Sequence, residues 1–92
     1  MAFALKGSFP NPFNASATIT YSLAQASWAH LVVHDITGRN IRTLVAARRE
    51  AGLHQTRWDG LDEHGKRVAS GVFLARLQTK SGTHTLKLTL LR

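Results

Sequence analysis

Two groups of side chains have residue types and spacings that could support chemistry. His30 and His34 lie four residues apart in HLVVH, a spacing that on a helix would place two imidazoles side by side for a zinc ion. Asp59, Asp62 and Glu63 lie within WDGLDEHG, and carboxylates are ligands that calcium prefers. Each group could hold a metal ion, and the elements that carry the residues decide whether it would.

The histidine pair lies in a segment with the pattern of a strand. In AHLVVHDI, residues 29–36, Leu31 and Val33 alternate with His30, Val32 and His34. Four residues along a strand span about 13 Å, whereas each ligand bond to a zinc ion is only about 2 Å long. We therefore expect the two imidazoles on the outer face of a sheet, without a shared metal.

The acidic stretch does not fit the calcium loop of an EF-hand. Counted from Asp59, loop positions three, six and twelve hold Leu61, His64 and Ser70, where the motif requires an oxygen ligand, Gly and Glu. We interpret the stretch as a corner, in which Asp59-Gly60 ends a strand and a second turn follows. A looser cation loop is the alternative, but we expect no metal and no cofactor.

Composition narrows the classes of function. The chain has 92 residues and no cysteine, so disulfides and thiolate metal sites are excluded. No Gly-x-Ser-x-Gly elbow occurs, and five scattered acidic residues do not suggest a catalytic pair. A domain of this size also has little room for a deep pocket. We expect a protein that is not an enzyme and has no catalytic residues.

The chain is basic, with 12 Lys and Arg against 5 Asp and Glu and a formal net charge of +7. This balance favours an anionic partner such as an acidic glycan or nucleic acid. The basic residues are spread along the chain, and several of its few aromatic residues are needed for a core, so nucleic-acid binding is not expected. No segment approaches the roughly 20 apolar residues of a membrane span, so no membrane insertion is expected either.

Alternating apolar residues predict an all-β protein. About seven short segments alternate, with turn signals between them, which is typical of an antiparallel immunoglobulin-like or fibronectin-III-like β-sandwich, here without a disulfide. Residues 41–52 are ambiguous, and we interpret them as a short strand followed by an irregular loop. Residues 1–8 form a linker or a leading strand, and residues 9–92 form the sandwich. The expected core residues are Ile19, Tyr21, Leu31, Val33, Trp58 and Leu77.

Four segments occur in an order that is similar to a known family. They are FPNPFNASATITYSL, VVHDITGRNIRTLV, AGLHQTRWDGLDEHGKRVASGVFLARL and LKLTLLR, and together they run from about Phe9 to Arg92. The chain resembles the C-terminal sorting domain of the bacterial type IX (Por) secretion system. It also resembles the related immunoglobulin-like domain of the flagellar hook-capping protein.

The resemblance implies a non-catalytic C-terminal module that directs an upstream passenger across the bacterial outer membrane. Its implied partners are the type IX secretion machinery and an upstream catalytic or adhesive domain. Its implied location is secreted or at the cell surface, reached through the periplasm. The alternative is a structural or spacer accessory domain, or a basic glycan-binding module of a secreted enzyme.

The resemblance also implies which residues are recognised. A terminal strand at a sheet edge exposes backbone groups that a receptor could bind by strand addition, and Lys87 and Arg92 would add charge attraction. The residues that match the family's motifs are Pro10, Asn11, Pro12, Gly38, Arg39, Gly71, Phe73, Lys87, Leu88, Leu90 and Arg92.

Overall fold

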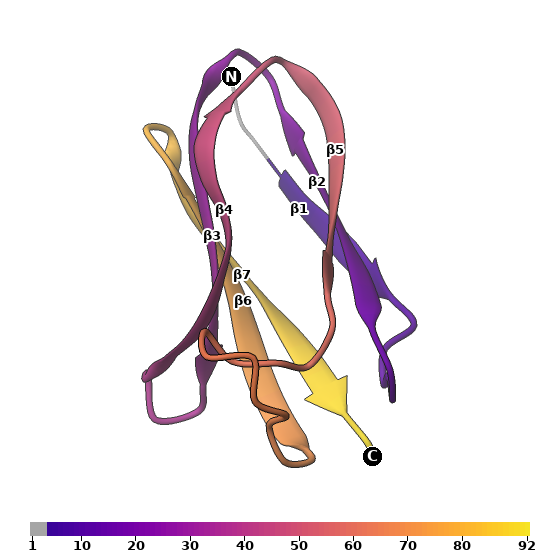
Figure 1. Cartoon of the computed structure of the whole chain (residues 1–92). Helices are drawn as coiled ribbons and strands as arrows, with labels where there is room; N and C mark the ends of the chain where they lie inside the picture. Colours follow the sequence, from indigo (N-terminus) through magenta and orange to yellow (C-terminus); the bar gives the residue numbers. More distant parts are fainter. Residues whose placement is uncertain (1–3) are drawn as a thin grey trace.

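A computed structural model describes residues 4–92, which form seven strands (Figure 1). This part of the chain has no helix, and hence none that is long and apolar enough to cross a membrane. The strands are β1 (Ala4–Phe9), β2 (Ala17–Leu23), β3 (Ser27–Asp35), β4 (Asn40–Arg49), β5 (Gly52–Trp58), β6 (Gly71–Thr79) and β7 (Gly82–Leu90).

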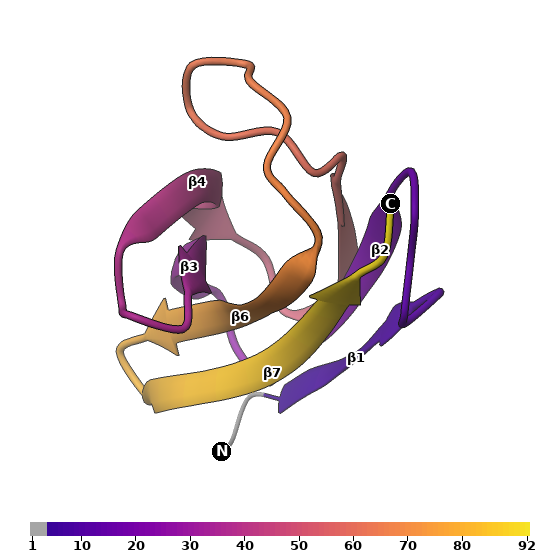
Figure 2. The ribbon, with the colours of Figure 1, turned by 90° about the horizontal axis from the view of Figure 1, so that it is seen from below.

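The strands form two antiparallel sheets that face each other. One sheet has the order β1-β2-β5 and the other the order β4-β3-β6-β7. The view from below shows the two layers curving around a shared interior (Figure 2). This arrangement confirms the predicted immunoglobulin-like β-sandwich of about seven strands. The leading segment is a strand, because β1 pairs with β2 from Ala4 onward.

The core follows from the alternation that the sequence shows. In β2 every second residue is buried, so Ile19 and Tyr21 face the opposite sheet while Thr18 and Thr20 face outward. The six residues expected in the core, namely Ile19, Tyr21, Leu31, Val33, Trp58 and Leu77, are all 0–1% exposed.

The prediction of a short strand at the start of residues 41–52 is confirmed, but the predicted loop after it is wrong as far as Arg49, because the chain continues as the ten-residue strand β4. Two register shifts in the pairing with β3 explain the confusing pattern. They insert Leu44 between the partners of Leu31 and Val32, and Ile41 between the partners of Val33 and His34. An inserted residue breaks the two-residue period of a strand and imitates helical spacing.

Candidate functional site

The expected recognition strand, β7, is an edge of the four-stranded sheet. Its outward backbone groups can be assigned from Thr89, because both its N–H and its C=O bond to groups outside the sheet. Outward groups alternate along an antiparallel edge, so those of Thr83, Thr85 and Lys87 point the same way. Thr83 and Thr85 are exposed in the first half of β7, where the Leu5 N–H of β1 donates to His84 Nδ1 at 3.1 Å.

The second half of the edge is closed by the loop that carries the Pro-Asn-Pro motif. The Asn11 side chain donates from Nδ2 to the Lys87 C=O at 2.9 Å and accepts from the Thr89 N–H at 3.0 Å. The Phe13 N–H donates to the Thr89 C=O at 2.9 Å, and the Leu91 N–H donates to the Phe13 C=O at 2.8 Å. The loop thus takes the place of a neighbouring strand, and the expectation that the terminal strand is free for strand addition is wrong at this point.

Replacing Asn11 with alanine is expected to open this edge. Both backbone partners lose their hydrogen bonds but can bond to water, so the free energy of unfolding should fall by about 1 kcal/mol. Hydrogen exchange should show faster exchange of the Thr89 amide. The control Asn11→Asp keeps the acceptor and loses the donor, so it should keep that amide protected. Unchanged exchange in Asn11→Ala would mean that the loop does not hold the strand.

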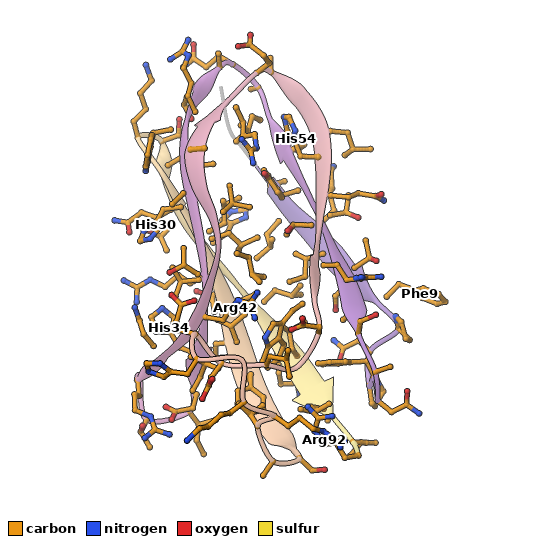
Figure 3. All side chains as sticks on the ribbon, in the orientation of Figure 1. Phe9, His30, His34, Arg42, His54 and Arg92 are labelled. Atoms are coloured by element: carbon orange, nitrogen blue, oxygen red, sulfur yellow. The ribbon has the colours of Figure 1, made fainter. Side chains whose placement is uncertain are left out.

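Arg92 fixes the other side of the strand end. Its guanidinium donates from Nε to the Val68 C=O at 2.7 Å and from Nη2 to the Gly60 C=O at 2.9 Å. Its backbone N–H donates to Ser70 Oγ at 2.9 Å. Figure 3 places Arg92 just beyond the end of β7. The side chain therefore clamps the long β5–β6 connection rather than extending freely toward a receptor.

The turn between β3 and β4 is built on the carboxylate of Asp35. Its Oδ1 accepts from Thr37 Oγ1 at 2.6 Å, from the Thr37 N–H at 2.9 Å and from the Arg39 N–H at 3.0 Å. Gly38 has φ +91°, which glycine adopts readily, and Arg39 pairs with Asp35 at 3.3 Å. The hydrogen bond from the Thr37 side chain, followed by that from the Arg39 N–H, lowers the pKa of Asp35.

The β5–β6 connection repeats this device at Asp62. Its Oδ1 accepts from the backbone N–H groups of Lys66 and His64, each at 2.9 Å. The bond from the Lys66 N–H is the main cause that lowers the pKa of Asp62, and the His64 N–H adds to it. The segment is thus a corner held by its own acid, as the sequence indicates.

Acid is expected to destabilise the domain through these two carboxylates. The unfolded chain binds a proton near the ordinary Asp pKa of about 3.9, whereas the folded chain resists protonation until a lower pH. The stabilisation is therefore present above about pH 4 and is lost as the pH falls through the lowered folded pKa values. Urea unfolding from pH 6 to pH 2 should show this loss. A double variant, Asp35→Asn with Asp62→Asn, should show a smaller loss, and parallel curves would contradict the assignment.

Contacts between connections bring these motifs to one end of the sandwich, the lower end in Figure 1. Arg42 lies 3.5 Å from Asp59 and 3.8 Å from Glu63, and the Glu63 N–H donates to the Ile41 C=O at 3.0 Å. The start of β4 and the β5–β6 connection therefore meet. Arg92 then links that connection to the end of β7.

The predicted recognition residues fall into different environments. Leu88 and Leu90 are 0% exposed and Phe73 is 7% exposed, so these three belong to the core. Gly71 starts β6 opposite Leu90. The positions open to a partner in the folded domain are Pro10, Asn11, Pro12, Gly38, Arg39 and Lys87, while Arg92 is exposed but engaged in its clamp.

Sequence reasoning missed two residues at this end of the sandwich. Phe13 is 2% exposed and packs with its ring centroid 5.6 Å from that of Trp58. Leu91 is 55% exposed and lines a shallow hollow of about 300 Å³ together with Pro10, Pro12, Phe13 and Asn14. The adjacent leucines 90 and 91 could have indicated the exposed one. Successive side chains of an extended chain point to opposite sides, so a buried Leu90 implies an outward-facing Leu91.

The residues first considered as metal ligands do not gather. Residues 4–92 contain no group of three His, Cys, Asp or Glu side chains placed to hold an ion. His34 Nδ1 lies 3.3 Å from the Gly38 C=O, and Asp59 Oδ1 accepts from the Leu61 N–H at 3.1 Å.

Solved structures with this fold include three bacterial proteins. PorU of Porphyromonas gingivalis, described as dimeric and latent, has a TM-score of 0.73 and 21% identity over 91% of this chain and 9% of its own. PorZ is described as an essential surface component of the type IX secretion system of the same organism. It has a TM-score of 0.65 and 22% identity over 92% of this chain and 11% of its own. The structure of FlgD from Xanthomonas campestris is described as giving insight into the hook capping that is essential for flagellar assembly. It has a TM-score of 0.61 and 22% identity over 95% of this chain and 64% of its own.

These likenesses concern the fold, and the chain spans less than two thirds of each of these proteins. No curated protein sequence matches the chain. The family model of the FlgD Ig-like domain matches residues 12–89, which run from the second proline of the Pro-Asn-Pro loop almost to the end of β7. The two sheets, the closed edge and the corner motifs therefore belong to a member of the FlgD Ig-like domain family.

Proposed function

We propose that this domain is a non-catalytic sorting module that directs an upstream passenger across the bacterial outer membrane by type IX secretion. The structural likeness to PorU and PorZ supports this function, and PorZ is itself described as part of that system. The passenger, catalytic or adhesive, would lie in another part of the parent protein. The domain would act at the cell surface or outside the cell.

The observation that carries the proposal is the joint surface made by the first and last motifs. Asn11 binds the backbone of β7, which places Pro10 and Pro12 beside the exposed Leu91. Lys87 is exposed on the strand that ends there. The secretion machinery would bind this small apolar surface on the folded domain, since the strand edge beneath it is already occupied.

The test is an export assay with point variants. Residues 1–92 are fused behind a signal peptide and a fluorescent reporter, in a bacterium with a working type IX system. Deletion of residues 87–92 is a poor probe, because it removes the core residues Leu88 and Leu90 and would unfold the domain. Leu91→Asp instead places a charge on the proposed surface without touching the core.

The matched control is Leu53→Asp, because Leu53 is 66% exposed on β5, away from this surface. Reporter should leave the cell with the parent domain and with Leu53→Asp, and should stay in the periplasm with Leu91→Asp. Thermal melts of the three purified domains should agree. Retention of the folded parent domain in the periplasm would overturn sorting, and normal export of Leu91→Asp would overturn this recognition surface.

The second candidate is a structural spacer domain like that of the hook-capping protein. It is favoured by the family model itself, which is that of the FlgD Ig-like domain, and by the likeness to FlgD. A spacer would leave the folded reporter fusion in the periplasm, so the same assay separates the two functions.

A further inference from the structure

The outer face of the four-stranded sheet carries a row of polar side chains that the proposed sorting function does not use. Trp28, His30 and His34 alternate along β3 on this face. The pairing register places Gln78 beside His30, and Arg76 beside Val32. Figure 3 shows His30 and His34 on the same side of β3, pointing away from the interior.

Two adjoining hollows follow this row. One, of about 360 Å³, is lined by Trp28, His30, Gln78, Thr79 and Lys80. The other, of about 100 Å³, is lined by His30, Val32, His34, Asn40, Arg76 and Gln78. They share His30 and Gln78, and together they form a shallow track. From Trp28 to His34 the track follows six residue steps of strand, about 20 Å.

The floor and walls of this track suit a hydroxylated ligand. Val32 is 4% exposed even though it lies on the outer face, so its neighbours cover it. Trp28 is 58% exposed and offers an apolar ring face at one end. Between the ends, imidazole, amide and guanidinium groups present planar hydrogen-bonding edges.

The charge of the track has one sign. Lys80 and Arg76 line it, and Arg48 pairs with Trp28 across the strands. None of the five acidic residues lines either hollow. Asp35 is the last residue of β3 and pairs with Arg39, and the other four acidic residues follow β4 or lie in the β5–β6 connection.

We propose that this track, defined by Trp28, His30, His34, Arg76, Gln78 and Lys80, binds an acidic polysaccharide. The exposed indole stacks on a sugar ring, the amide and imidazole groups bond to hydroxyls, and the basic side chains pair with carboxylate or sulfate groups. A single-stranded nucleic acid fits less well, because stacking of successive bases uses several aromatic platforms, and within residues 4–92 Trp28 is the one exposed Phe, Tyr or Trp side chain on this face. The inference is independent of the sorting function.

The test is affinity electrophoresis of the domain, residues 1–92, at low salt. Gels contain polygalacturonate, heparin, neutral dextran or polyuridylate. We expect retardation by polygalacturonate, by heparin, or by both, which identifies the acidic group, and none by dextran. Added salt should weaken binding because it screens exposed charges. Trp28→Ala and Arg76→Gln should each lower the affinity roughly five- to tenfold.

Matched controls lie on the opposite sheet, where Phe9 is 79% exposed and Arg57 faces outward beside Thr18. Phe9→Ala and Arg57→Gln should keep the parent affinity. Three results would overturn the proposal: no retardation by either acidic polysaccharide, retardation by polyuridylate as strong as that by the polysaccharides, or an equal loss in the control variants. Thermal melts check that all four variants are folded.

Discussion

Trp58→Ala is expected to lower the free energy of unfolding by about 3–5 kcal/mol, a large part of the total of about 5–15 kcal/mol of a small domain. The side chain is 0% exposed and its indole N–H donates to the Leu61 C=O at 2.9 Å. Its ring lies 5.6 Å from that of Phe13 and 5.1 Å from that of Phe73, between centroids. Alanine would leave a cavity beneath the end of β7 and an unpaired carbonyl in the corner.

The chain contains its own control for this experiment. Trp28 is 58% exposed, so Trp28→Ala removes the same side chain without opening a cavity in the core. Urea unfolding should place Trp58→Ala far below the parent domain and Trp28→Ala close to it. Equal stability of the two variants would show that Trp58 does not support the core.

Trp58 also shows how far sequence reasoning reaches. Its position in LHQTRWDG, with Thr56 two residues and His54 four residues before it, placed it on the inner face of a strand. The same alternation located Ile19, Tyr21 and most of the core, because a sandwich buries one face of each strand.

The sequence alone did not predict the contacts between residues that are far apart along the chain. Asn11 bonds to residues 76 and 78 positions away, and Arg92 bonds to Gly60, 32 positions away. No local sequence pattern indicates that the Asn11 amide will bond to the edge of β7 in place of a neighbouring strand. Motif matching selected Asn11 and Arg92, but as residues for a receptor, whereas both bond within the domain. The two bulged residues of β4, Ile41 and Leu44, made the strand look ambiguous for a related reason. A bulge is defined by the pairing with the partner strand, which the local sequence does not give.

Gly60→Ala is expected to cost about 2–4 kcal/mol, which combines backbone strain with weakened hydrogen bonds. Gly60 has φ +76°, a conformation that alanine rarely adopts. A Cβ atom at this position would lie 2.6 Å from Arg92 Nη2. The guanidinium can move, but moving it breaks its bonds to the Gly60 and Val68 carbonyl groups. The clamp and the turn would therefore be lost together.

A double-mutant cycle separates these two causes. In an Arg92→Ala background the guanidinium is absent, so Gly60→Ala should cost only the backbone strain, about 1–2 kcal/mol. The sum of the two single-variant losses should therefore exceed the loss in the double variant. Strict additivity would mean that Arg92 does not lie against Gly60 and does not clamp the corner. Coupling would establish that the last side chain of the sequence stabilises the fold, so that a loss of export on its removal would not by itself identify it as a recognition residue.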